Sequence, residues 1–373
     1  MSTKAALLLA FGILIGGTVN GQPKAIQGLL DARNVDFGSG RISLNGQWLW
    51  VDGKLITPPG LDYRNSLPVE FPEIWNDARS GRVGLGVATY YLTIQLPSSF
   101  SKYGLELPQM YSSYKLWVNN KLVASNGNPG MNSTTTQSQW LPQTVAIEAV
   151  DTLQIVLQIA NFGHDKGGCK EPIYLGNQDT LLAKDRVSNI SKMVELVTLA
   201  IIAAIFVGIY LSGRRKKVII YFALLCFTWS VRSAFSNEYL AIRLMPDFDW
   251  TAMVKIEYIT LYLTMIWAIL FLSRLFINES NHIVKYVLVI LNSVFVAFTI
   301  FNPPVLFTKM LALYLGTSGI LIVYAIVVII RAYINERTGA AFLTISSLLG
   351  ILIFSYDIFT YEGIFSFNSV LFS

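Results

Sequence analysis

The sequence predicts a multi-domain membrane protein in which an all-β domain precedes an all-α bundle of transmembrane helices. Three observations predict this fold class: an apolar N-terminal run, a middle region of short alternating strands, and a series of apolar segments after about Met193. Only 14% of the 373 residues are charged, whereas ordinary soluble domains carry about 25%. Because the apolar residues are unevenly distributed, we expect one exported soluble domain followed by one membrane domain.

The formal net charge of +5 does not indicate nucleic-acid binding. Basic residues cluster beside apolar segments, as in residues 214–217, where they set membrane orientation. The soluble region shows no basic face of the kind that a nucleic-acid reader presents. Cys169 lies in the soluble region and Cys226 in an apolar segment, so we expect no disulfide framework. The sequence also gives no reason to expect a cofactor or a metal site, since His164 has no second histidine nearby.

The N-terminus has the pattern of a secretory signal peptide. Lys4 precedes an apolar run over residues 5–15, and small or turn-forming residues follow up to Gly21. The run is shorter than the roughly 20 residues that a transmembrane helix needs. We therefore expect residues 1–21 to be a signal peptide, with an uncleaved anchor helix as the alternative. Either interpretation places the next domain outside the cytoplasm.

Residues 22–186 alternate short strand patterns with turn signals. Residues 42–50, 88–96 and 153–160 are rich in β-branched and aromatic side chains and largely alternate apolar with polar positions. Many short strands separated by proline, glycine and asparagine predict a β-sandwich or jelly roll.

One hairpin can be predicted closely. Residues 114–118 and 121–124 flank the pair Asn119-Asn120. A two-residue loop of type I′ requires positive φ at both positions, and asparagine is strongly enriched among the non-glycine residues that adopt it. The sequence therefore predicts a tight turn between paired strands.

Three stretches resemble a known family: residues 44–48, 113–123 and 159–168. They are similar to the extracytoplasmic jelly roll of bacterial seven-transmembrane receptors with diverse intracellular signalling modules. That domain is galactose-binding-like and is itself similar to the sugar-binding domain of family 2 glycosidases. The family usually has Asn-Gly at the hairpin, and Asn119-Asn120 keeps the turn chemistry.

The resemblance implies a small-molecule or carbohydrate-like ligand for the soluble domain. Binding pockets combine apolar and aromatic surfaces with a few placed polar groups, so the candidates are Trp75, Trp140, His164 and Asp165. Packing in the core or at the rim is the alternative for each tryptophan. His164 and Asp165 lie in the glycine-rich loop 163–168, whose alternative role is to cap the sandwich. We expect no catalytic residue.

Residues 187–373 form the predicted membrane domain. Six apolar segments approach bilayer length: 193–211, 218–235, 253–275, 284–301, 307–330 and 340–356. A seventh begins at Ile364 and the sequence ends at Ser373, so we expect six complete helices and an incomplete seventh.

Basic residues predict the orientation of this domain. The loop after the first segment contains residues 214–217, the loop after the third is bounded by Arg274 and Lys285, and the loop after the fifth carries Arg331 and Arg337. The positive-inside rule places these loops in the cytoplasm. We therefore expect a multi-pass protein of the bacterial inner membrane whose N-terminal domain is periplasmic.

The membrane domain resembles the same receptor family at five places. These are residues 221–226, Arg232, 238–239, 257–258 and 356–359. The resemblance implies a sensory receptor, a homodimer, and a downstream module of the histidine kinase or cyclase type, which family members carry after the seventh helix and this sequence lacks. The expectation is thus a truncated or split receptor.

Ionisable residues inside the apolar segments form a second set of candidates. They are Glu195, Arg232, Lys255, Glu257 and Asp357. Because such residues are rare and commonly functional, we expect a polar layer that couples ligand state to helix packing. The alternative is that long side chains extend to the lipid headgroups.

Other classes of function fit less well. A glycosidase needs two carboxylates around the scissile bond, usually on a larger domain, and a transporter usually shows internal repeats, which this sequence does not. A membrane-anchored carbohydrate-binding protein without signalling output is the alternative that the sequence leaves open.

Overall fold

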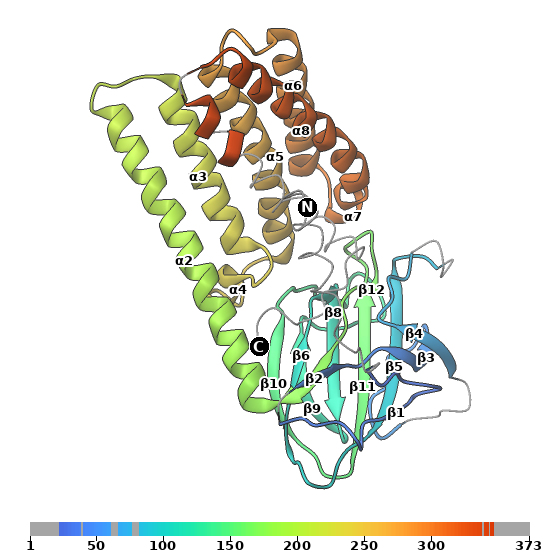
Figure 1. Ribbon diagram of the computed structural model, residues 1–373. Helices are drawn as coiled ribbons and strands as arrows, with labels where there is room; N and C mark the ends of the chain where they lie inside the picture. Colours follow the sequence, from blue (N-terminus) through green and yellow to red (C-terminus); the bar gives the residue numbers. More distant parts are fainter. Residues whose placement is uncertain are drawn as a thin grey trace, which may run out of the picture.

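The computed structural model describes residues 22–38, 40–60, 66–76, 82–337, 339–342 and 344–346 (Figure 1). A β domain and a bundle of helices lie end to end, and helix α2 (Gln178–Leu211) runs along both (Figure 1). The expected signal peptide, Asp357, most of the sixth apolar segment and the seventh lie outside the described residues.

The β domain is a sandwich of two sheets. The larger sheet has the order β4-β3-β5-β11-β8-β9, with β1 added in parallel to β5, and the smaller sheet has the order β10-β6-β13-β2. The strands are β1 (Leu29–Asp31), β2 (Arg41–Ser43), β3 (Gly46–Asp52), β4 (Leu67–Phe71), β5 (Gly86–Gln95), β6 (Lys102–Leu107), β7 (Met110–Tyr111), β8 (Ser113–Val118), β9 (Lys121–Asn126), β10 (Gln143–Glu148), β11 (Thr152–Asn161), β12 (Gly168–Cys169) and β13 (Tyr174–Asn177). The predicted sandwich is confirmed.

Alternation along the strands explains the core between the sheets. In β5, Tyr90, Leu92 and Ile94 are at most 1% exposed and belong to the main core, whereas Tyr91 packs with Trp117 on the opposite face of the sheet. Burial of each large apolar side chain contributes about 1.5–3 kcal/mol. The alternation of apolar and polar residues in the sequence therefore identifies correctly which side chains of the strand point into the core.

The predicted hairpin between β8 and β9 is confirmed. Asn119 and Asn120 have φ of 47° and 67°, and Val118 pairs with Lys121 across the turn. Both turn residues thus adopt the left-handed region that a type I′ turn demands.

Helix α2 (Gln178–Leu211) begins directly after β13. The side chain of Asn177 caps it, accepting from the backbone N–H of Asp179 at 2.9 Å and of Thr180 at 3.2 Å. A helix of 34 residues is about 51 Å long, which exceeds the roughly 30 Å of a hydrocarbon core. The helix is thus longer than a membrane is thick, and its first part packs on the smaller sheet instead. There the buried side chain of Leu181 lies against Gly104 of β6.

The remaining helices form the bundle. They are α3 (Lys217–Phe235), α4 (Leu240–Leu244), α5 (Trp250–Leu275), α6 (His282–Phe301), α7 (Pro304–Phe307), the 3₁₀ turn η2 (Thr308–Met310) and α8 (Leu311–Ile334). Within the described residues, five helical stretches are long and apolar enough to cross a membrane: 178–211, 217–235, 250–275, 282–301 and 304–334. They agree with the first five apolar segments of the sequence. We call the end of the bundle that contacts the β domain the near end, and the opposite end the far end.

Candidate ligand site between the two domains

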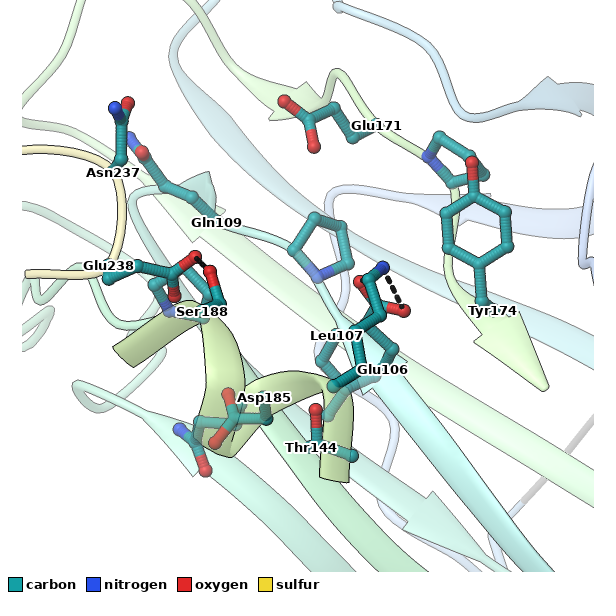
Figure 2. Close-up of a pocket in the computed structure, with 15 residues that line it drawn as sticks. Glu106, Leu107, Gln109, Thr144, Glu171, Tyr174, Asp185, Ser188, Asn237 and Glu238 are labelled. Carbon is teal, nitrogen blue, oxygen red and sulfur yellow. Dashed lines mark hydrogen bonds and ion pairs between the residues drawn. The ribbon is translucent and has the colours of Figure 1, made fainter. Parts of the chain in front are cut away.

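A cavity of about 290 Å³ lies where the β domain meets α2 and the loop between α3 and α4 (Figure 2). This volume is near the lower end of ligand pockets, about 300–1,000 Å³. The lining residues are Glu106, Leu107, Pro108, Gln109, Pro142, Gln143, Thr144, Glu171, Pro172, Tyr174, Lys184, Asp185, Ser188, Asn237 and Glu238. The walls thus combine two domains in one small space.

Acidic groups dominate the charged lining of this cavity. Four carboxylates face a single lysine: Glu106, Glu171, Asp185 and Glu238 against Lys184. Figure 2 shows these carboxylates spread around the walls rather than gathered at one point. Such a cavity favours a neutral or positively charged occupant over an anion.

Glu106 is the best-neutralised of the four carboxylates. Lys184 of α2 donates to both of its oxygens, at 2.7 and 3.1 Å, and Arg41 of β2 pairs with it as well. Arg41 also lies 3.9 Å from the centre of the Tyr174 ring. Burial raises the pKa of Tyr174, an effect that Arg41 partly opposes, so this phenol is a neutral hydrogen-bonding group in the wall. By contrast, Glu171 is exposed and forms no ion pair with a described residue.

Arg243 of α4 braces the side of the cavity nearest the bundle. Its guanidinium donates to the backbone oxygen of Pro142 at 2.9 Å and to Asp185 at 3.3 Å, and it lies 3.9 Å from the Glu238 carboxylate. Ser188 of α2 donates to Glu238 at 2.6 Å. One arginine therefore links the β domain, α2 and the α3–α4 loop.

A second contact between the domains is aromatic, and we call it the aromatic joint. It comprises Tyr111, Trp140 and His164 of the β domain with Tyr239 and Trp250 of the bundle, and every member is at most 8% exposed. Ring centroids lie 5.4 Å apart for Trp140 and Trp250, and 4.7 Å apart for the stacked pair of Tyr111 and His164. Gly163 is required beside them, because a Cβ there would lie 2.8 Å from the Trp250 ring.

Burial fixes His164 in its neutral form. Desolvation lowers the pKa of His164 to about 3. Its Nδ1 lies 3.0 Å from the backbone N–H of Lys166 and accepts from it. Asn161 holds the same loop, accepting from the N–H of His164 at 3.1 Å and donating to its carbonyl at 2.8 Å. His164 is thus a structural group at physiological pH.

The four ligand candidates proposed from the sequence do not gather at the cavity. Trp140 and His164 belong to the aromatic joint, 5.3 Å apart. Asp165 contacts the bundle through its backbone N–H, which donates to Thr308 at 3.2 Å. Trp75 lies in the sandwich core and donates to Tyr90 at 2.6 Å. Burial of the three ring side chains favours the packing roles that the sequence left open as alternatives.

Sequence reasoning missed the residues that line the cavity. They come from five separate stretches between Glu106 and Glu238, so no local motif brings them together. One available signal was the run of polar residues that precedes the first apolar segment, which includes Lys184, Asp185 and Ser188. These polar residues continue the helix outside the membrane and face the β domain.

The ionisable residues within the bundle make separate contacts. Glu195 accepts from Lys192 at 2.9 Å and from Trp229 of α3 at 3.2 Å. Arg232 of α3 donates to the backbone oxygen of Glu257 at 2.6 Å. These contacts join α2 to α3 and α3 to α5, as a polar layer would require.

Lys255 differs from the others in this set. Its ammonium donates to the backbone oxygen of Ile300 at 2.8 Å, one residue before α6 ends. This position, at the near end of the bundle, fits the alternative in which a long side chain extends toward the membrane surface.

A β domain that continues through one helix into an apolar bundle defines a multi-pass membrane protein with a large domain on one side. Residues 193–373 match the sequence model of a family described as "7TM diverse intracellular signalling". The helical part of the chain is therefore similar to a family of transmembrane signalling proteins.

Parts of several solved glycoside hydrolase structures are similar to about a third of this chain. A β-glucuronidase from Faecalibacterium prausnitzii shares 14% identity over 36% of this chain and 31% of its own length, with a TM-score of 0.29. A glycosyl hydrolase family 2 member from Bacteroides cellulosilyticus shares 13% identity over 36% of this chain and 20% of its own, with a TM-score of 0.29. A β-galacturonidase from Eisenbergiella tayi shares 14% identity over 37% of this chain and 24% of its own, with a TM-score of 0.26.

This chain thus spans less than one third of the length of each of these enzymes, and their activities are not assigned to it. No curated protein matches the chain.

Proposed function

We propose that this protein is a sensory receptor whose cavity between the β domain and α2 binds a small, hydroxyl-rich ligand. The single observation that carries the proposal is the continuity of α2. The same helix contributes Lys184, Asp185 and Ser188 to the cavity wall and then crosses the bundle to Leu211 without a break. A ligand that alters the fit of α2 against the β domain displaces the helix along its length, because α2 contains no proline, a common cause of sharp kinks.

The lining supports a carbohydrate-like ligand. Amide and hydroxyl groups of Gln109, Gln143, Thr144 and Asn237 can donate to or accept from sugar hydroxyls, and Tyr174 adds an aromatic ring to the lining. Glu171, the one lining carboxylate that forms no ion pair with a described residue, favours amino sugars over neutral sugars and disfavours uronates. Binding of this kind biases helix packing only by the difference in affinity for two arrangements.

Basic residues support an extracytoplasmic β domain. Residues 214–217 follow the end of α2, Arg274 is in the last turn of α5, and Arg331 is in the last turn of α8. All three places lie at the far end of the bundle. The positive-inside rule assigns that end to the cytoplasm, so the β domain belongs on the periplasmic side of a bacterial inner membrane, in agreement with the expected signal peptide. A kinase or cyclase module then receives the signal at the far end.

A binding series on the full chain in lipid nanodiscs tests the ligand class. The probes are glucosamine, galactosamine, glucose, galactose and glucuronate, each titrated calorimetrically. We expect the two amino sugars to bind most tightly and glucuronate least. Thr144→Trp fills the cavity and abolishes binding, whereas Thr152→Trp, the same change at an exposed strand position, leaves it intact. Equal binding to both variants contradicts the assigned site.

A non-signalling sugar binder is the alternative function. A non-signalling binder and a receptor give the same result in the sugar titrations, but only the receptor moves α2 when it binds the ligand. Binding that leaves every distance between α2 and the other helices unchanged would favour this alternative.

A further inference from the structure

A second hollow lies at the far end of α2, on the surface of the bundle. It has a volume of about 440 Å³ and is lined by Ile205, Gly208, Ile209, Ser212 and Arg214. We call it the α2 hollow. Its first four residues occupy positions i, i+3, i+4 and i+7 and so share one face of the helix, and all four are exposed. Gly208 leaves the space open, since no atom of a described residue lies within 4 Å of a Cβ built there.

The α2 hollow opens away from the rest of the bundle. The opposite side of α2 packs on α3, where the rings of Phe206 and Phe222 lie 4.7 Å apart between centroids. Figure 1 shows α2 along the outer edge of the bundle, and the lining of the hollow comes only from α2 and the loop that follows it. The occupant of the hollow must therefore come from the surroundings of the bundle.

The lining of the α2 hollow changes from apolar to polar along the helix axis. Ile205 and Ile209 belong to the stretch that is apolar enough to cross a membrane, which ends at Leu211. Ser212 and Arg214 lie beyond that end. From Ile205 to Ser212 the helix rises by about 10 Å, less than half of the roughly 30 Å of a hydrocarbon core. The hollow thus spans the boundary between acyl chains and headgroups, which suits an amphipathic occupant.

The charge at this end selects an anion. Residues 214–217 are two arginines and two lysines, all exposed, and the sequence has no acidic residue between Glu195 and Glu238. None of the four basic residues forms an ion pair with another described residue. Membrane orientation accounts for basic residues in this loop, but not for a guanidinium in the wall of an apolar hollow. Arginine binds phosphate through two parallel hydrogen bonds.

We infer that the α2 hollow binds one anionic phospholipid. The phosphate lies at Arg214, and an acyl chain lies against Ile205 and Ile209 in the space that Gly208 leaves. The hydroxyl of Ser212 donates to the backbone oxygen of Gly208 at 2.7 Å, so its oxygen is left to accept from the headgroup. A headgroup with hydroxyl donors, as in phosphatidylglycerol, meets this requirement.

A choline headgroup fits the α2 hollow poorly, because it brings a fixed positive charge to residues 214–217. A phospholipid held at this point attaches the last turn of α2 to the membrane surface, so displacement of α2 depends on the anionic lipid content. The inference does not depend on the ligand proposed for the cavity.

Native mass spectrometry of the full chain in detergent tests this inference. The protein is offered equal amounts of phosphatidylglycerol and phosphatidylcholine with the same acyl chains, and we expect it to retain one phosphatidylglycerol. Arg214→Gln should weaken this binding at least about tenfold, because a charged hydrogen-bond pair is lost. Arg331→Gln is the matched control, an exposed arginine in the last turn of α8 at the same end, and should bind like wild type. Equal losses in both variants would mean general charge attraction and contradict the inference.

A second pair of variants tests the acyl-chain part of the hollow. Gly208→Leu fills the space and should lower the affinity for phosphatidylglycerol as much as Arg214→Gln does. Gly316→Leu on α8 is its control, since Gly316 is also exposed and also has no atom of a described residue within 4 Å of a built Cβ. Leucine is a good helix former, so both variants keep their helices. Undiminished binding in Gly208→Leu overturns the inference.

A soluble competitor separates a lipid from a free phosphate ester. Glycerol 1-phosphate carries the phosphate but no acyl chain, and an excess of it should leave phosphatidylglycerol bound. Displacement by glycerol 1-phosphate would assign the hollow to soluble anions and contradict the inference. Wild-type protein that shows no preference for phosphatidylglycerol over phosphatidylcholine, including a case in which another protein chain covers the hollow, would contradict it as well.

Discussion

The β domain contacts the bundle in two regions of opposite character. The aromatic joint is packed and apolar, with Trp140 3% and Trp250 8% exposed. The cavity a short distance along the interface is hollow and polar, and its links, such as Lys184 to Glu106, are partly exposed ion pairs. Dense aromatic packing resists displacement, whereas partly exposed ion pairs contribute little to stability. The comparison suggests that the joint acts as a pivot and the cavity as the side that opens or closes.

The largest expected effect comes from removing the centre of the pivot. Trp140→Ala deletes a buried ring that contacts Tyr111, His164, Tyr239 and Trp250, and should destabilise docking of the β domain by about 3–5 kcal/mol. Hydrogen exchange measured in nanodiscs should accelerate in the first turns of α5. Trp140→Phe, which keeps a ring, should lose less. Unchanged exchange in Trp140→Ala would mean that the joint is not the pivot.

The brace across the cavity should have a smaller effect. Arg243→Gln removes the cation that serves Asp185 and Glu238 and should cost about 1–3 kcal/mol. Arg243→Lys keeps the charge without the planar geometry and should fall between. Chemical unfolding followed by tryptophan fluorescence measures both variants. A brace variant that costs more than Trp140→Ala would reverse the proposed roles of the two regions.

His164 makes the stability of the joint depend on pH. Its pKa falls from 6.5 to about 3 in the folded protein, so the unfolded chain binds a proton in this interval and the folded chain does not. The contribution of His164 is complete above pH 6.5 and is lost as pH falls toward 3, by up to about 1.4 kcal/mol per pH unit. The difference in unfolding free energy between wild type and His164→Gln, measured from pH 7 to pH 4, should show this slope. A difference that stays constant with pH would place His164 in contact with solvent.

The smallest effect is expected at the rim of the cavity. Lys184→Ala breaks an ion pair whose side chains are 49% and 29% exposed, and should change stability by less than about 1 kcal/mol. High salt should reduce the difference further. Thermal unfolding at low and high salt measures it. A larger, salt-insensitive loss would mean that this side of the interface is as fixed as the joint.

Local patterns in the sequence predict the parts of the fold that depend on local physics. The β8–β9 turn follows from two residues that tolerate positive φ, and five membrane helices follow from apolar segments of bilayer length. The start of α2 could not be found in this way. Its apolar segment begins at Met193, but the helix begins at Gln178, because Asn177 caps a polar stretch that the β domain supports.

The candidate site was harder to predict for a related reason. Trp140 and Trp250 are 110 residues apart in sequence, and only the docking of two domains makes them neighbours. Aromatic residues such as Trp140 therefore resemble ligand-binding groups in the sequence and serve as packing groups in the structure. The cavity residues match no local sequence motif, and they form a site only because α2 brings the β domain and the bundle together.

The most direct test of the account is whether a change inside the cavity moves α2 at the far end of the bundle. Spin labels at Leu211 of α2 and Ile334 of α8, both exposed at that end, report the distance between the helices in nanodiscs. Thr144→Trp serves as a fixed occupant of the cavity and Thr152→Trp as its control. The account predicts a shifted distance distribution in Thr144→Trp and none in Thr152→Trp. An identical distribution in all three proteins would contradict the claim that α2 carries the state of the cavity across the membrane.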